Sequence, residues 1–144
     1  MNSILLIDDD KITIYLQKTL VESLDFCQQV FVCKNGQEAL HFLAARHEAG
    51  QPFPDVILVD LNLPVLDGFA FLEAYKGLGY HQQYPAMVYV LTTSRNPIDV
   101  ERVDQIGIAP CLTKPLVEDN LWHMYEASYE QKRRMRLQRL VNAR

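Results

Sequence analysis

Residues 55–68 read DVILVDLNLPVLDG, and the character of this stretch changes sharply after Asp60. The first part is an unbroken apolar run between two aspartates, and the second part is punctuated by Pro64 and by the pair Asp67-Gly68. A short apolar run bounded by turn residues is typical of a strand buried on both faces, as in a parallel sheet. We therefore expect a strand over Asp55–Asp60 and a loop over Leu61–Gly68.

Similar apolar runs recur on both sides of this stretch, and helical patterns follow them. Strands are expected over Ser3–Ile7, Gln29–Cys33, Asp55–Asp60, Ala86–Leu91 and Ile108–Leu112. Helices are expected over Ile12–Leu24, Gln37–Glu48, Phe69–Leu78 and Pro97–Gln105, with a long last helix from about Glu118 to about Asn142. Alternating strands and helices favour a parallel sheet covered on both faces. The sequence thus predicts an α/β fold: a (βα)5 doubly wound, five-stranded parallel sheet in a flavodoxin-like three-layer sandwich with an extended C-terminal helix.

The composition fits one ordinary domain. The chain has 144 residues, of which 49% are hydrophobic and 22% charged, which is enough apolar material for a core. No apolar run approaches the roughly 20 residues that span a bilayer, and the first residues do not resemble a signal peptide. We expect a cytoplasmic protein with no membrane association. The three cysteines, Cys27, Cys33 and Cys111, contain no CxxC pair and are interpreted as small apolar residues rather than disulfide or zinc ligands.

Charge is divided unevenly along the chain. Residues 131–144 carry six basic side chains and no acidic one, whereas the other 130 residues hold 8 basic and 18 acidic, a net charge of −10. We therefore divide the chain into a body over 1–130 and a basic C-terminal extension of the last helix over 131–144. The extension is either a solvated tail or a helix that docks on an acidic surface, which could belong to a second copy (a homodimer) or to a kinase. The acidic body opposes binding of nucleic acid.

Polar residues stand where the predicted strands end. Asp8, Asp9 and Asp10 follow the first strand, Asp60 ends the third, Thr92 follows the fourth, and Lys114 follows the fifth. Ligands of open parallel sheets bind at the carboxyl ends of the strands, so these side chains are expected at one edge. Clustered carboxylates suit Mg²⁺, and a metal with an ammonium group neutralises an incoming phosphoryl group. A carboxylate is then a plausible nucleophile, and the hydroxyl can donate to a phosphoryl oxygen.

Each of these residues has a plainer interpretation when it is taken by itself. An aspartate after a strand often forms a turn or caps a helix, and Asp10 could equally be only the N-cap of the first helix. Thr92 could be an ordinary strand terminus, and Lys114 an ordinary surface lysine. Their joint placement at one sheet edge favours the functional interpretation.

Four blocks of sequence carry a resemblance to a known family. They are ILLIDDD, VILVDLNLPVLDGFAFL, VYVLTTS and LTKP, which together extend from Ile4 to Pro115. The chain resembles the receiver domain of bacterial response regulators, and the single-domain members of chemotaxis type are the most similar in shape. The resemblance implies a phosphorylation-activated switch of a two-component system, which takes its phosphoryl group from a sensor histidine kinase or a histidine phosphotransfer protein. Output would pass through contact with a downstream protein, and the chain would catalyse only its own Mg²⁺-dependent phosphorylation and dephosphorylation.

The resemblance also assigns roles to individual positions. Asp60 matches the phospho-acceptor, and Thr92 and Lys114 match the switch hydroxyl and the lysine that pairs with the phosphoryl group. The implied metal ligands are Asp9 directly, Asp8 through water, Asp60, and the backbone carbonyl of Asn62. The Lys114–Pro115 bond matches one that is commonly cis.

Two positions depart from the family pattern. Cys111 stands where the family usually has a Tyr or Phe that rotates inward on activation, and Thr93 is bulkier than the residue usual there. No aromatic rotation is therefore expected at Cys111, and Tyr84 and Tyr89 are the aromatic residues nearby in the sequence.

Two other functions remain open at this point. A phosphatase of haloacid-dehalogenase type would use Asp8 as nucleophile and Asp10 as acid, but it needs a later acidic pair, for which only Glu118-Asp119 is present. A degenerate receiver would bind partners without phosphorylation.

Overall fold

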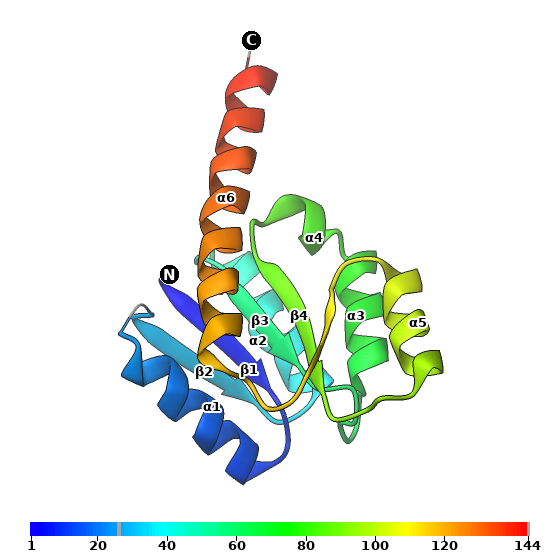
Figure 1. Ribbon diagram of the computed structural model, residues 1–144. Coiled ribbons are helices and arrows are strands. Elements are labelled where there is room, and N and C mark those ends of the chain that lie inside the picture. Colours follow the sequence, from blue (N-terminus) through cyan, green and yellow to red (C-terminus); the bar gives the residue numbers. More distant parts are fainter. Residues whose placement is uncertain (26, 144) are drawn as a thin grey trace.

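A five-stranded parallel sheet forms the centre of the molecule. The computed structural model describes residues 1–25 and 27–143. The strands are β1 (Ser3–Ile7), β2 (Gln29–Cys33), β3 (Val56–Val59), β4 (Met87–Thr92) and β5 (Cys111–Thr113), in the spatial order β2-β1-β3-β4-β5. Every paired neighbour is parallel, so all five carboxyl ends lie at one edge of the sheet (Figure 1).

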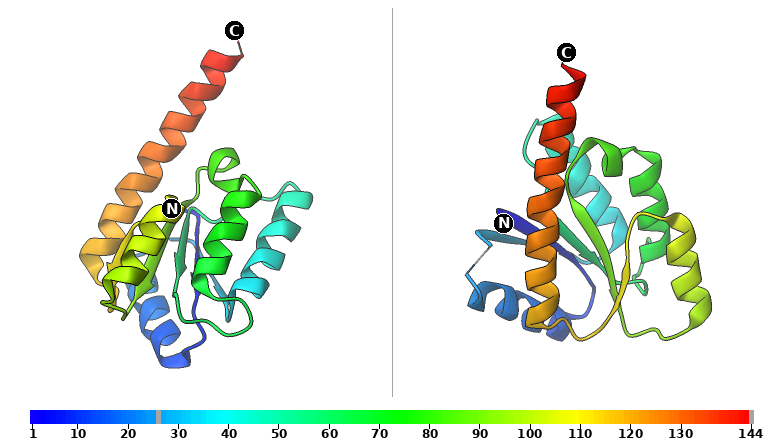
Figure 2. Two further views of the ribbon diagram at one scale, coloured as in Figure 1. Left: turned by 90° about the vertical axis from the view of Figure 1, so that its right-hand side faces the viewer. Right: turned by 45° about the horizontal axis from the view of Figure 1, so that its top comes forward.

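Helices cover both faces of this sheet (Figures 1 and 2). They are α1 (Lys11–Ser23), α2 (Gly36–Glu48), α3 (Gly68–Gly77), the single turn α4 (Tyr80–Gln83), α5 (Pro97–Ile106) and α6 (Glu118–Asn142). Helices α1 and α6 cover one face, and α2, α3 and α5 cover the other. The predicted doubly wound α/β fold with its extended C-terminal helix is confirmed.

The core is split by the sheet into two halves. Successive side chains of a strand point to opposite faces, so Leu5 and Ile7 of β1 pack against α2 and α3, while Ile4 and Leu6 pack against α1 and α6. All five residues of β1 are buried. The continuous apolar runs of the sequence are thus explained by helices on both sides of the strands.

Most element boundaries lie within one residue of the sequence prediction, and two differences are larger. The fifth strand is Cys111–Thr113 rather than Ile108–Leu112, because Pro110 has no N–H to give the ladder and contributes only its carbonyl, which accepts from Val90. The turn α4 between α3 and β4 was not predicted. Strand β5 therefore ends directly before Lys114, whereas α4 lies at the opposite edge of the sheet (Figure 1).

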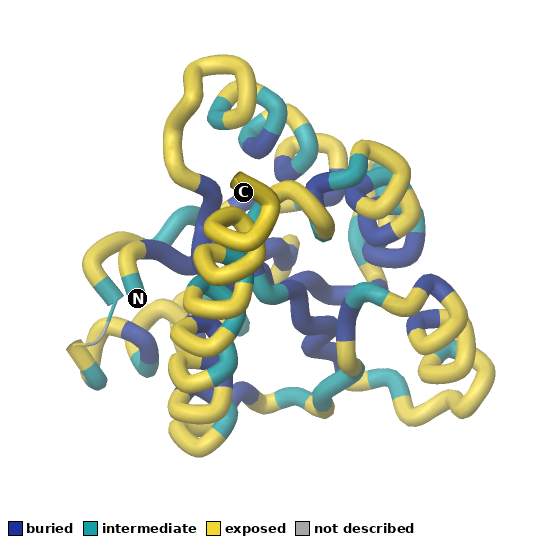
Figure 3. The backbone as a smooth tube through the Cα atoms, turned by 90° about the horizontal axis from the view of Figure 1, so that it is seen from above, coloured by how far each residue is buried: buried dark blue, intermediate teal, exposed yellow. Residues whose placement is uncertain are grey.

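Helix α6 extends well past the sheet (Figures 1 and 2). In the first half of α6, Leu121, Met124 and Ser128 are buried, whereas Tyr125 is 37% exposed. Only a narrow side of this helix therefore meets the sheet. Every residue of α6 from Arg136 to Asn142 is exposed (Figure 3).

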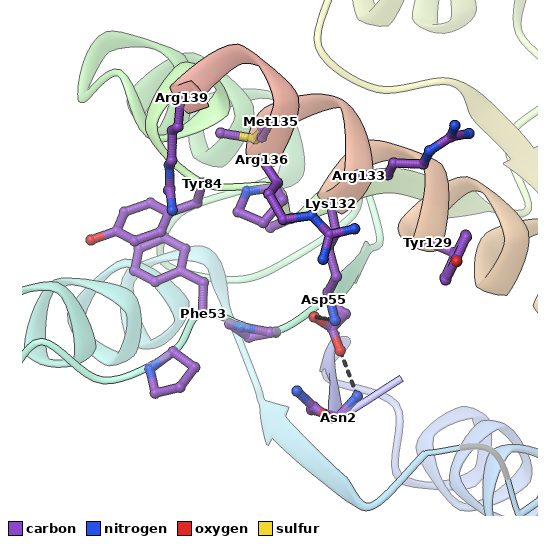
Figure 4. A pocket seen from close by; sticks show the side chains of 14 residues that line it. Asn2, Phe53, Asp55, Tyr84, Tyr129, Lys132, Arg133, Met135, Arg136 and Arg139 are labelled. Carbon is purple, nitrogen blue, oxygen red and sulfur yellow. Dashed lines mark hydrogen bonds and ion pairs between the residues drawn. The ribbon is translucent and has the colours of Figure 1, made fainter. Parts of the chain in front are cut away.

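One ion pair fixes the point at which α6 leaves the sheet (Figure 4). Lys132 Nζ lies 2.7 Å from Oδ1 of Asp55, whose other oxygen accepts the backbone N–H of Asn2 at 2.5 Å. A cavity of about 490 Å³ opens beside this pair, between α6 and the loops that precede β3 and β4. Its floor includes the stacked rings of Phe53 and Tyr84, 3.6 Å apart.

Within the described residues, none of the helices has both the length and the apolar character that crossing a membrane requires.

Candidate functional site

Backbone hydrogen bonds hold the key residues at the carboxyl edge of the sheet. The N–H of Asp60 donates to Ile7, that of Asp8 to Cys33, and that of Lys114 to Thr92, at 3.0, 3.1 and 2.9 Å. Each bond extends a strand ladder by one residue. Asp8, Asp60 and Lys114 therefore lie directly after the strands, at the edge where the sequence placed them.

Three carboxylates meet at this edge. Asp8, Asp9 and Asp60 each present an oxygen, and these oxygens lie within 4.8 Å of one another. Asp8 and Asp60 are buried, whereas Asp9 is exposed. Hard oxygen ligands of this number, with one side open to water, fit a magnesium ion that keeps several of its waters.

A single lysine reaches into the acidic cluster. Lys114 Nζ lies 2.6 Å from Oδ2 of Asp8 and 3.4 Å from Oδ2 of Asp60. Burial lowers the pKa of Lys114, but the hydrogen bond to Asp8 and the charge of Asp60 outweigh it, so the pKa lies above its ordinary value. Burial raises the pKa of Asp60, and the charge of Lys114 only partly offsets this. One ammonium group beside three carboxylates leaves this edge with a net negative charge, which can hold a cation.

Asp10 belongs to the helix and not to the cluster. Its carboxylate accepts the backbone N–H of Ile12 and the hydroxyl of Thr13, both at 3.0 Å, which is an N-cap of α1. The bond from Thr13, followed by that from Ile12, lowers the pKa of Asp10. The capping interpretation of Asp10 fits this geometry.

The polar end of β4 is linked to the helix that follows it. Thr92 is buried, and its Oγ1 accepts the N–H of Ser94 at 3.2 Å. The hydroxyl of Ser94 donates in turn to Asp99 of α5 at 2.7 Å. A change at Thr92 can therefore reach α5 through two hydrogen bonds. The link to Asp99 was not predicted from the sequence.

The loop after Asp60 contains a constraint that the sequence analysis did not assign. A Cβ on Gly68 would lie 2.3 Å from the carbonyl oxygen of Asp60, so only glycine fits there. Gly68 also donates its N–H to Leu61 at 3.0 Å. The signal was the Asp67-Gly68 pair, which was interpreted only as a turn. Asn62 lies exposed in this same loop.

The structure also shows where Cys111 and the two nearby tyrosines lie. Cys111 is half-buried at the start of β5 and packs on the α2–α3–α5 side, where burial raises the pKa of its thiol. Tyr89 faces the opposite half of the core, and Tyr84 precedes β4 at the other end of the sheet. Neither tyrosine occupies the place of Cys111. The Lys114–Pro115 bond is cis, as the resemblance implied.

Comparison with known proteins agrees with this geometry. The response regulator receiver domain family matches residues 4–126. The chain belongs to this family. Among curated relatives of this receiver, response regulator Rcp1 of Synechocystis is 32% identical over 124 residues, which is 85% of this chain and 83% of Rcp1. The probable methanogenesis regulatory protein FilR2 of Methanothrix harundinacea is 31% identical over 118 residues, 82% of this chain and 75% of that protein.

Solved structures show the same receiver fold. A two-component response regulator from Cytophaga hutchinsonii superposes with a TM-score of 0.81 at 24% identity and covers 90% of this chain and 98% of its own. The Mn²⁺-bound form of Rcp1 superposes with a TM-score of 0.70 at 29% identity and covers 89% of this chain and 90% of its own.

The acidic pair Glu118-Asp119, the only candidate for the later acidic pair of a phosphatase, lies in the first turn of α6.

Proposed function

We propose that this receiver is a phosphorylation-activated switch that accepts a phosphoryl group on Asp60 with the help of Mg²⁺. The observation that carries the proposal is the position of Lys114, whose ammonium lies between Asp8 and Asp60 in a cluster of three carboxylates. An aspartate so placed can act as nucleophile, since the surrounding charges can neutralise an incoming phosphoryl group.

The transfer would use each residue of the edge. A carboxylate oxygen of Asp60 attacks the phosphorus, an acyl phosphate forms, and the bond to the donor's histidine nitrogen breaks. Lys114 neutralises charge on the phosphoryl oxygens, and the hydroxyl of Thr92 donates to one of them. If the Thr92 side chain turned toward that oxygen, its hydrogen bond with the N–H of Ser94 would change. Because the hydroxyl of Ser94 donates to Asp99, the change would reach α5.

The hydrogen bonds that each carboxylate already makes indicate how it would bind the metal. Asp8 accepts hydrogen bonds from Lys114 at 2.6 Å and from the N–H of Asp10 at 3.0 Å, which suits a ligand that acts through water. Asp9 is exposed and suits a direct ligand, together with Asp60 and the backbone carbonyl of Asn62. Bound Mg²⁺ would supply positive charge to the transferring phosphoryl group.

Partners follow from the family and from the surface beside the site. The relatives include the signal transduction histidine-protein kinase BarA of Escherichia coli, 28% identical over 122 residues that make up 12% of BarA. Next to the site, Ile12, Tyr15 and Leu16 of α1 are 72%, 68% and 61% exposed, an apolar surface that suits a docking phosphodonor. We infer a cytoplasmic partner, a sensor histidine kinase or a histidine phosphotransfer protein. Output passes through contact with a downstream protein or a second copy.

The assignment of Asp60 is tested by labelling with acetyl phosphate. We expect Mg²⁺-dependent, single-site labelling of the natural chain and none of Asp60→Asn, which keeps the shape and removes the nucleophile. Asp67→Asn, in the same loop, serves as the matched control and should label normally. Labelling of Asp60→Asn at the natural level would refute the proposal, and sustained release of phosphate from a generic phosphate ester would favour a phosphatase instead.

A further inference from the structure

The cavity between α6 and the loops that precede β3 and β4 is lined by an excess of basic side chains (Figure 4). These side chains all come from α6 and are Lys132, Arg133, Arg136 and Arg139. Of the described residues that line the cavity, only Asp55 is acidic. The cavity therefore has a local positive charge, although the chain as a whole carries a net charge of −4.

Two of these basic side chains are free to bind an anion. Asp55 already pairs with Lys132 at 2.7 Å and accepts two backbone N–H groups, so it does not neutralise the arginines. Arg136 and Arg139 reach toward the cavity, whereas Arg133 turns away from it (Figure 4). Within the part of the chain that the structure describes, the side chains of Arg136 and Arg139 have no hydrogen-bond or ion-pair partner.

The opposite side of the cavity is apolar and already ordered. The rings of Phe53 and Tyr84 stack with an interplanar angle of 10°, and the hydroxyl of Tyr84 is hydrogen-bonded to His47. Tyr84 is only partly buried, and Pro85 and Met135 also line the cavity. A fixed aromatic surface of this kind suits the packing of a flat ring.

We propose that this cavity binds a nucleotide, with its phosphate group held by Arg136 and Arg139 and its planar base packed against Tyr84 and Met135. Guanidinium groups bind phosphate through paired hydrogen bonds. The volume of about 490 Å³ lies within the roughly 300–1,000 Å³ that is usual for small-molecule sites. A small ligand is favoured over a nucleic acid, because a long polyanion would also meet the acidic body of the chain.

This site is separate from the proposed phosphorylation site. Asp55 precedes β3 and Asp60 follows it, so the cavity and the acidic cluster lie at opposite edges of the sheet. Nucleotide binding therefore does not depend on Mg²⁺ or on phosphorylation of Asp60. It can be measured in the presence of a chelator, where the carboxylates beside Asp60 repel phosphate.

The proposal is tested by isothermal titration calorimetry of the full chain with AMP, GMP, CMP and UMP. We expect at least one of them to bind with one site per chain. Ribose 5-phosphate lacks the base and should bind at least about fivefold more weakly, because stacking of a base on an aromatic ring is lost. This comparison varies the ligand and leaves the fold of the protein unchanged.

Variants of three exposed arginines test the position of the phosphate. Arg136→Ala and Arg139→Ala should each weaken binding of that nucleotide about tenfold, since each removes a hydrogen bond between charged groups. Arg134→Ala is the matched control, because Arg134 lies on the same helix but does not line the cavity. It should change the affinity by less than about twofold.

Four results would overturn the proposal. The first is that none of the four nucleotides binds at any soluble concentration. The second is that ribose 5-phosphate binds as tightly as the best nucleotide, so that the base makes no contact. The third is an equal loss in Arg134→Ala, which would indicate general attraction to the basic helix. The fourth is a poly-glutamate peptide that binds more tightly than every nucleotide and loses its binding in Arg136→Ala, which would assign the cavity to an acidic protein instead.

Discussion

The two ends of β3 each carry a buried aspartate beside a lysine, and the two pairs differ in their balance of charge. At the amino end, Asp55 pairs with Lys132 at 2.7 Å and also accepts the N–H groups of Asn2 and Ser3. At the carboxyl end, Asp60 shares its lysine with a second aspartate, which holds that lysine more closely. The first carboxylate is satisfied within the chain, while the second lies in an excess of negative charge.

This difference separates a structural pair from a reactive one. A buried carboxylate with its own cation and N–H donors stabilises the fold, and removing it leaves those donors unpaired. A buried carboxylate among other carboxylates lowers stability until a cation or a chemical change relieves it. Burial raises the pKa of Asp60, and under the proposed function bound Mg²⁺ would relieve the same unfavourable negative charge.

Replacing the two lysines should give the largest contrast. Lys114→Met removes the charge that would face the phosphoryl group, and we expect phosphorylation by acetyl phosphate to slow by roughly 10²–10³-fold, the usual cost of one preorganised donor. Lys132→Met, at the other end of the sheet, should change the rate by less than about twofold because it is remote from the site. Rates are measured at saturating Mg²⁺. Equal slowing in both variants would mean that the loss is one of folding and not of the site.

Neutralising the two aspartates should change stability in opposite directions. Asp55→Asn loses the pair with Lys132 and weakens two N–H bonds, which should cost about 2 kcal/mol. Asp60→Asn without metal should instead stabilise the fold by up to about 1 kcal/mol, a typical single-substitution effect. Urea unfolding in the presence of a chelator measures both. Destabilisation by Asp60→Asn would contradict the view that its charge is unfavourable.

The dependence on pH sharpens this prediction. Because the pKa of Asp60 is raised in the folded state, folding favours the protonated form of this side chain. Its favourable contribution to the free energy of unfolding is therefore present at low pH. It is lost as the pH rises from the unfolded pKa through the folded pKa. The advantage of Asp60→Asn over the natural chain should therefore be near zero in acid and grow through this range. An advantage that is constant with pH would have another cause.

The sequence predicted the strand ends better than the surfaces of the helices. Asp8, Asp60, Thr92 and Lys114 could be placed because parallel strands put their carboxyl ends at one edge whatever the exact boundaries are. The sequence could not show that Ile12 and Leu16 of α1 are exposed while Gln17 is buried, since a helix with apolar residues on several sides does not reveal which side meets the sheet. The packing of Gly68 on Asp60 was missed for a similar reason, as it depends on a contact across a loop.

Removing the part of α6 that extends beyond the sheet should have the smallest effect on the stability of the fold. We predict that a chain ending after Glu130 stays folded and is phosphorylated at the natural rate, because the body over 1–130 contains the site and the core. It should lose only about 1 kcal/mol, the contribution of Lys132 to Asp55, whose two N–H donors remain. A chain ending after Arg133 keeps that pair and should recover most of the loss in urea unfolding. Failure of the shorter chain to fold would show that the basic extension belongs to the domain, and would move the boundary at residue 130 toward the C-terminus.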